Sequence, residues 1–95
     1  MVKGTLHIAR QFYGLENEGV YDVVFTRDRQ KEPDPKPVVR RFFGEQELAN
    51  FLTRHLRRDP TEVKNLIRRI TEENHADIPN LEFRPEELRK LKLAT

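Results

Sequence analysis

Apolar residues alternate with polar ones in three segments of the first half of the chain, which is the pattern of β-strands. In the segment 5–13, Leu6 and Ile8 alternate with polar or small residues, and the composition suits either a half-buried strand or a short helix. The segment Val20–Thr26 is dense in β-branched and aromatic residues, which favour strands. Val38–Phe43 repeats this pattern. We therefore predict three consecutive strands that pair as an antiparallel meander.

The spacing of apolar residues changes after Gly44 from the period of a strand to the period of a helix. Apolar residues then return every three or four positions, which predicts an amphipathic helix over Glu45–Arg57. The apolar side of this helix consists of Leu48, Phe51, Leu52 and Leu56.

A second helix is predicted to begin at Asp59 and Pro60. Asp59 is a favourable N-cap residue, and Pro60 would occupy the first helical position, where its missing N–H costs nothing. Glu62 is placed to bond back to the cap in the manner of a capping box. Asn74, which tolerates the left-handed conformation of a helix C-cap, marks the predicted end. The apolar side of this helix consists of Val63, Leu66, Ile67 and Ile70.

The end of the chain carries weaker signals. Leu81–Phe83 suits a short strand or an extended packing segment, and Pro85 opens a short helix that carries Leu88 and Leu91. Together these elements predict one α+β domain spanning residues 1–95. We expect a three-stranded antiparallel meander sheet with two or three helices packed on one face.

A polar segment separates the second and third predicted strands. It contains Pro33, Pro35 and Pro37, which cannot donate a hydrogen bond to a sheet and favour polyproline geometry. We therefore expect a flexible proline-rich loop over residues 27–37. A loop of this length fits either a partner-binding arm or a tolerated insertion, and we favour the insertion.

The composition excludes several kinds of chemistry. The chain has no Cys and no Ser, which removes disulfides, thiolate nucleophiles, zinc ribbons and serine-based catalysis. Its four glycines form no phosphate-binding loop, and no nucleophile, base and orienting group occur at a recognisable spacing. The carboxylates and the imidazole between Glu72 and Asp77 are too loosely spaced for a metal site. We therefore expect a non-enzymatic protein without a cofactor or a metal.

Charge and hydropathy place the chain among folded proteins that do not span a membrane. Charged residues make up 36% of the 95 residues, yet the net charge is only +2. Leu, Ile, Val and Phe together number 27, which is enough for a folded core. No apolar run exceeds three residues, and the start of the chain lacks the apolar stretch of a signal peptide. We therefore expect a cytoplasmic location.

The predicted sheet points to a protein-binding function. Consecutive strand residues point to opposite faces, so Phe42 and Phe43 cannot both face the helices. If Tyr21 and Phe25 share the outer face, the sheet exposes an apolar patch of the kind that binds partners. Coverage of that face by the N-terminal segment or the C-terminal helix is an equally weighted alternative. Our leading hypothesis is a module that binds a protein partner or forms a homodimer through Tyr21, Phe25, Phe42 and Phe43.

A basic cluster supports nucleic-acid binding as the alternative function. Between residues 54 and 69, six positive charges stand against two negative ones. Arginine side chains bind phosphate oxygens bidentately, although such clusters are more often a solvated helix surface. The residues that would contact nucleic acid are Arg54, Arg57, Arg58, Lys64 and Arg68.

Overall fold

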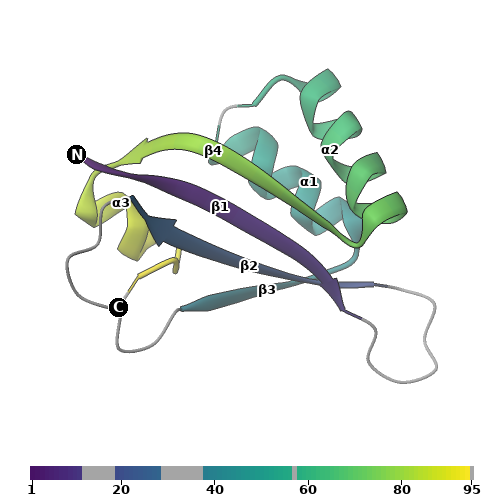
Figure 1. Cartoon of the computed structure of the whole chain (residues 1–95), viewed down its shortest axis with the longest axis horizontal. Coiled ribbons are helices and arrows are strands. Elements are labelled where there is room, and N and C mark those ends of the chain that lie inside the picture. Colours follow the sequence, from purple (N-terminus) through teal and green to yellow (C-terminus); the bar gives the residue numbers. More distant parts are fainter. Residues whose placement is uncertain (12–18, 29–37, 57, 95) are drawn as a thin grey trace.

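The computed structural model describes residues 1–11, 19–28, 38–56 and 58–94. They form an α+β arrangement of four strands and three helices (Figure 1). In chain order the elements are β1 (Val2–Gln11), β2 (Val20–Arg27), β3 (Val39–Phe43), α1 (Glu45–Arg54), α2 (Pro60–Glu73), β4 (His75–Phe83) and α3 (Pro85–Lys90). The segment 5–13, which suited strand or helix, belongs to a strand as far as Gln11. Most of the predicted proline-rich loop, from residue 29 to residue 37, lies outside the described residues.

The sheet has the order β3-β2-β1-β4, and all neighbouring strands are antiparallel (Figure 1). The first three strands form the predicted meander. The expectation of a three-stranded sheet is wrong, because β4 pairs with the free side of β1. The alternation of buried and exposed residues in β4 is interrupted by a β-bulge. Ile78 pairs with Leu6 and Leu81 pairs with Gly4. Two residues of β4, Pro79 and Asn80, therefore lie opposite the single residue Thr5 of β1. The bulge shifts the alternation by one residue, and only the end of β4 reads as a strand in the sequence.

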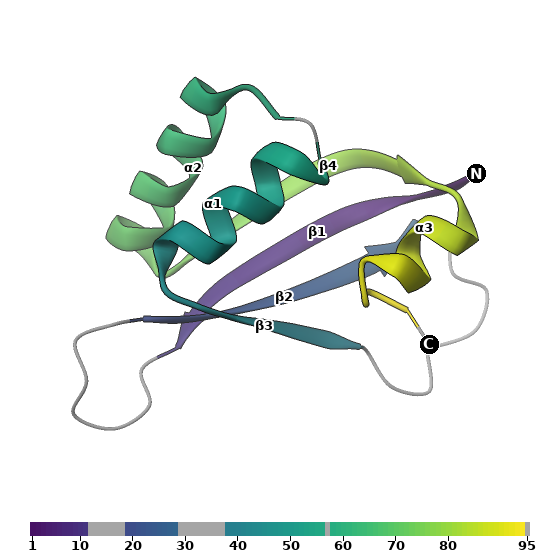
Figure 2. The same cartoon turned by 180° about the vertical axis from the view of Figure 1, so that it is seen from behind.

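All three helices lie on one face of the sheet (Figure 2), as predicted. The strands turn alternate side chains toward them, and these side chains form one core with the apolar sides of the helices. The most deeply buried large side chains are Leu6, Ile8, Tyr21, Val23, Phe42, Leu48, Leu52, Ile70 and Leu88. The opposite face of the sheet is called the open face below, because no described element covers it.

The local signals at α2 are confirmed at both ends. Asp59 caps the helix by accepting a hydrogen bond from the backbone N–H of Thr61 at 3.0 Å, and Pro60 is the first helical residue. Asn74 ends the helix in the left-handed conformation, with φ 66°. Glu62 forms an ion pair with Arg58 at 3.6 Å in place of the expected capping box.

The helix predicted over Glu45–Arg57 is shorter in the structure, because α1 ends at Arg54 and His55 is its C-cap; Arg57 lies outside the described residues. Leu56, which belongs to the predicted apolar side, is partly buried against the core beyond the helix end. Within the part of the chain that the structure describes, no helix is long and apolar enough to cross a membrane.

Candidate functional site

Three of the four aromatic residues proposed for the outer face lie in the core instead. Tyr21, Phe25 and Phe42 are 1%, 7% and 2% exposed. Tyr21 pairs with Phe42 across β2 and β3, while Phe25 pairs with Leu6, and all of these side chains face the helices. The expectation that Tyr21, Phe25 and Phe42 are available at the surface is therefore wrong. Alternation shows which residues share a face, but it is symmetrical between the two faces and does not say which one the helices cover.

Phe43 lies on the open face, where it is 68% exposed. It pairs with Val20 across β2 and β3, and Val39, which is 49% exposed, pairs with Val24 four residues further along the two strands. Val20 and Val24 are half-buried. These four residues, called the open-face patch below, are Val20, Val24, Val39 and Phe43. The spacing of two between Val39, Arg41 and Phe43 is the sequence signal from which the patch could have been recognised.

An ion pair lies in the middle of the open-face patch. Arg41 Nε donates to Asp22 Oδ1 at 2.9 Å, and these residues oppose each other between the two apolar pairs. The Asp22 side chain is only 16% exposed, so its carboxylate is held within the sheet surface. The patch therefore presents both signs of charge at its centre with apolar groups on either side.

A polar row crosses the rest of the open face from β4 through β1 to β2. His7 Nδ1 donates to Asp77 Oδ1 at 2.8 Å, because a carboxylate only accepts, and His7 Nε2 lies 2.7 Å from Thr26 Oγ1. This order of acid, imidazole and hydroxyl is that of a catalytic triad. The three groups occupy neighbouring positions on adjacent strands, and the His7 and Asp77 side chains are 44% and 54% exposed. We interpret the row as a cross-strand bridge that stabilises the sheet. The sequence did not reveal it, because His7 and Asp77 are 70 residues apart.

Both edges of the sheet carry features that oppose the addition of a further strand. At the β3 edge, the backbone N–H of Phe43 donates to Glu47 Oε2 at 3.2 Å. At the β4 edge, the bulge contains Pro79, which has no N–H, and Asn80, whose φ is 60°. A partner of this sheet therefore has better access to its open face than to its edges.

The basic residues that the structure describes do not form one patch. Arg58 and Arg68 form ion pairs with Glu62 and Glu72, the second at 3.3 Å. Lys64 is exposed on α2, whereas Arg54 lies at the end of α1. Arg57 lies outside the described residues. The charge excess counted along the sequence is therefore partly neutralised and is divided among different surfaces.

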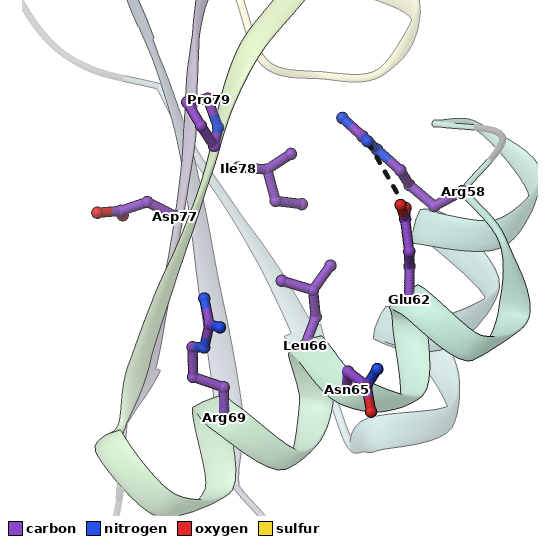
Figure 3. A pocket seen from close by; sticks show the side chains of 8 residues that line it. All are labelled: Arg58, Glu62, Asn65, Leu66, Arg69, Asp77, Ile78 and Pro79. Carbon is purple, nitrogen blue, oxygen red and sulfur yellow. Dashed lines mark ion pairs between the residues drawn. The ribbon is translucent and has the colours of Figure 1, made fainter.

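A groove of about 240 Å³ separates α2 from β4. Figure 3 shows Leu66 and Ile78 pointing into it from opposite sides, while Asp77 points away toward the open face. Arg69, which was also counted in the basic cluster, lines the groove together with Arg58. Its volume is below the roughly 300 Å³ at which ligand pockets ordinarily begin.

No group of three or more His, Asp or Glu side chains is arranged to hold a metal ion within the described ranges. A comparison with models of known families finds no match, and comparisons with curated proteins and with solved structures find none either.

Proposed function

We propose that this protein is a small binding module that forms a homodimer through the open face of its sheet. The observation that carries the proposal is the exposure of Phe43 and Val39, at 68% and 49%, beside the half-buried Val20 and Val24. Together with Met1, Phe43 and Val39 are the exposed large hydrophobic residues of the described chain. Full burial of a Phe side chain contributes about 1.5–3 kcal/mol, and a two-fold interface buries each patch residue twice.

The charges of the open face favour a second copy of the chain over nucleic acid. Two cations, Lys3 and Arg41, stand against three anions on the strands of this face, Asp22, Asp77 and Glu82. A face without excess positive charge does not attract phosphates. A two-fold axis through the patch brings Arg41 of one copy toward Asp22 of the other, so the ion pair at its centre is self-complementary.

The size of the open face agrees with a dimer of moderate strength. Strands of 10, 8, 5 and 9 residues, at about 3.4 Å per residue and about 4.8 Å between strands, give a footprint of roughly 500 Å². Protruding side chains raise the accessible area above this footprint. Interfaces of weak and moderate complexes bury about 600–800 Å² per partner.

The test is the solution mass of the wild type and of Phe43→Asp, measured by light scattering at low and high salt. We expect the wild type to be a dimer that persists at high salt, because an apolar interface is not weakened by screening. Phe43→Asp should raise the dimer Kd by about 100-fold or more. Each copy loses the burial of one phenyl ring, and each places one carboxylate in the interface. The circular dichroism of this variant should remain close to that of the wild type, since Phe43 is not in the core, while its Tm should fall by the stabilisation that dimer formation supplies.

The matched control is Thr53→Asp, which adds the same charge at an exposed position of α1 away from the open face. This variant should remain a dimer. A wild type that stays monomeric at millimolar concentration, or a Phe43→Asp variant that dimerises as well as the wild type, overturns the proposal. In the first case, salt-sensitive binding of mixed RNA or DNA that is weakened by Arg58→Glu would instead favour the nucleic-acid alternative.

A further inference from the structure

A cavity of about 660 Å³ lies on the helix side of the sheet, between the C-terminal end of α1 and α3. Figure 2 shows α3 beyond the C-terminal end of α1 and over the same face. The volume is within the range of roughly 300–1,000 Å³ that small-molecule ligands occupy. The residues around this α1–α3 cavity are Met1, Arg54, His55, Glu82, Phe83, Arg84, Glu87, Lys90 and Leu91.

Three cations from separate parts of the chain line the α1–α3 cavity. Arg54 belongs to the last turn of α1, Arg84 lies between β4 and α3, and Lys90 ends α3. None of them forms an ion pair with another residue in the described part of the chain. Because these three side chains have no ionic partner there, each can attract an anion that binds in the cavity.

The two carboxylates at the α1–α3 cavity already have partners. Glu82 forms an ion pair with Lys3 at 3.4 Å, on the side of the open face. Glu87 Oε1 accepts a hydrogen bond from the backbone N–H of Arg84 at 3.2 Å. The Lys3 ammonium offsets the charge of Glu82, whereas Glu87 keeps its negative charge, so the three cations leave the cavity with an excess of positive charge.

Part of the surface of the α1–α3 cavity is apolar. Phe83 and Leu91 are 6% and 8% exposed, so a small part of each side chain faces the cavity while the rest belongs to the core. Phe83 is held in place by an edge-to-face contact with Phe25, with ring centroids 5.4 Å apart. The cavity therefore combines some apolar surface with three cations, which suits a ligand with an anionic head and an apolar body.

We infer that the α1–α3 cavity binds a small organic phosphate. Arg54, Arg84 and Lys90 hold the phosphoryl group, and the organic body lies against Phe83 and Leu91. A phosphate monoester carries a charge of about −1.5 to −2 at pH 7, which offsets three cations better than a single carboxylate does. Its three oxygens accept hydrogen bonds from arginine and lysine side chains together. This site is on the opposite side of the sheet from the open face, so it does not depend on dimer formation.

The test is a titration of the ¹⁵N-labelled full chain, followed by the shifts of its amide resonances. The probes are phenyl phosphate, inorganic phosphate, which has the head without the body, and benzoate, which has the ring with a single charge. We expect phenyl phosphate to shift the amides of residues 54–55, 82–84 and 87–91 and to bind tighter than the other two probes. Lys90→Gln and Arg54→Gln should each weaken its binding by about tenfold or more.

The matched control is Lys64→Gln, which removes the same charge from an exposed position on α2. It should leave the affinity for phenyl phosphate unchanged, and the amide spectra report whether each variant folds. Equal weakening by Lys64→Gln and Lys90→Gln would show attraction to net charge alone and overturn the inference. Shifts confined to other residues, or no saturable shift up to about 10 mM phenyl phosphate, would overturn it as well.

Discussion

Tyr21 shows how a core position alters the chemistry of one hydroxyl group. Burial raises its pKa above the ordinary value of 10.0, and the negative charge of Glu45 raises it further, whereas the positive charge of Arg10 lowers it. The folded protein therefore holds the Tyr21 proton more tightly than the unfolded chain does. Stability linked to this group is complete below pH 10.0 and is lost as the pH rises through the higher folded-state pKa.

We predict that Tyr21→Phe reduces the loss of stability in alkaline solution. The measurement is the free energy of unfolding from urea denaturation at about pH 8 and about pH 11. The wild type should lose more stability between these two pH values than the variant, because the variant has no hydroxyl to ionise at this position. The interpretation of Tyr21 fails if both proteins lose the same amount.

Phe42 and Phe43 show that neighbouring residues of one type have opposite roles. Phe42 is 2% exposed and packs against Phe51 with ring centroids 4.8 Å apart, whereas Phe43 is 68% exposed. The pleat of the strand sends the two rings to opposite faces. Substitution of Phe42 therefore tests the core, and only substitution of Phe43 tests the interface.

At the scale of elements, α2 has the clearest boundaries. The Asp59 carboxylate satisfies the Thr61 N–H, and Asn74 N–H donates to the Ile70 carbonyl at 2.8 Å. By contrast, α1 begins after Gly44, which has φ 90°, without a side-chain cap. The left-handed backbone at Gly44 favours glycine and turns the chain from β3 into the helix.

We predict that Asp59→Ala lowers the free energy of unfolding by about 1 kcal/mol, through loss of the cap on α2. Asp59→Asn is the matched control, because asparagine caps a helix about as well as aspartate but carries no charge. Chemical denaturation of the three proteins provides the measurement. If Asp59→Asn is as unstable as Asp59→Ala, the negative charge rather than the cap is responsible.

At the scale of the whole molecule, Arg40 joins parts of the chain that are distant in sequence. Its guanidinium group lies 4.8 Å from the ring centroids of both Phe42 and Phe51, and its Nη1 donates to the Leu91 carbonyl at 2.7 Å. The last residues of the chain are thereby attached to β3 and α1. Leu88, Leu91 and Leu93 bury their side chains in the core.

We predict that Arg40→Met releases α3 from the rest of the fold. A hydrogen bond from a charged donor contributes about 1.5–3 kcal/mol, so local opening of residues 85–94 should increase by about tenfold or more. Hydrogen exchange of these residues, or the rate of tryptic cleavage after Lys90, measures this opening. Arg41→Met is the matched control, because Arg41 lies on the open face and pairs with Asp22. Equal opening of α3 in both variants would contradict the assigned role of Arg40.

Much of the secondary structure could be predicted from local patterns. The caps of α2 and the start of α3 at Pro85 depend on residues within one helical turn, so they can be predicted from the local sequence. β4 could not be predicted in full. Its bulge at Pro79 and Asn80 moves the buried residues from one alternation to the other, and a pattern of period two does not continue across such a shift.

The candidate sites depended on information that no local pattern contains. The helices, the strands after Gly19 and Pro37 and the lack of cysteine and serine chemistry could be expected from neighbouring residues or from composition, whereas the segment 5–13 suited a strand or a helix. That the helices cover the face with Tyr21 and Phe42 and leave Phe43 exposed became clear from the packing of the elements. That packing also brought Arg54, Arg84 and Lys90 to one cavity. The physical reason is that alternation treats both faces of a sheet alike, whereas burial depends on long-range packing between elements.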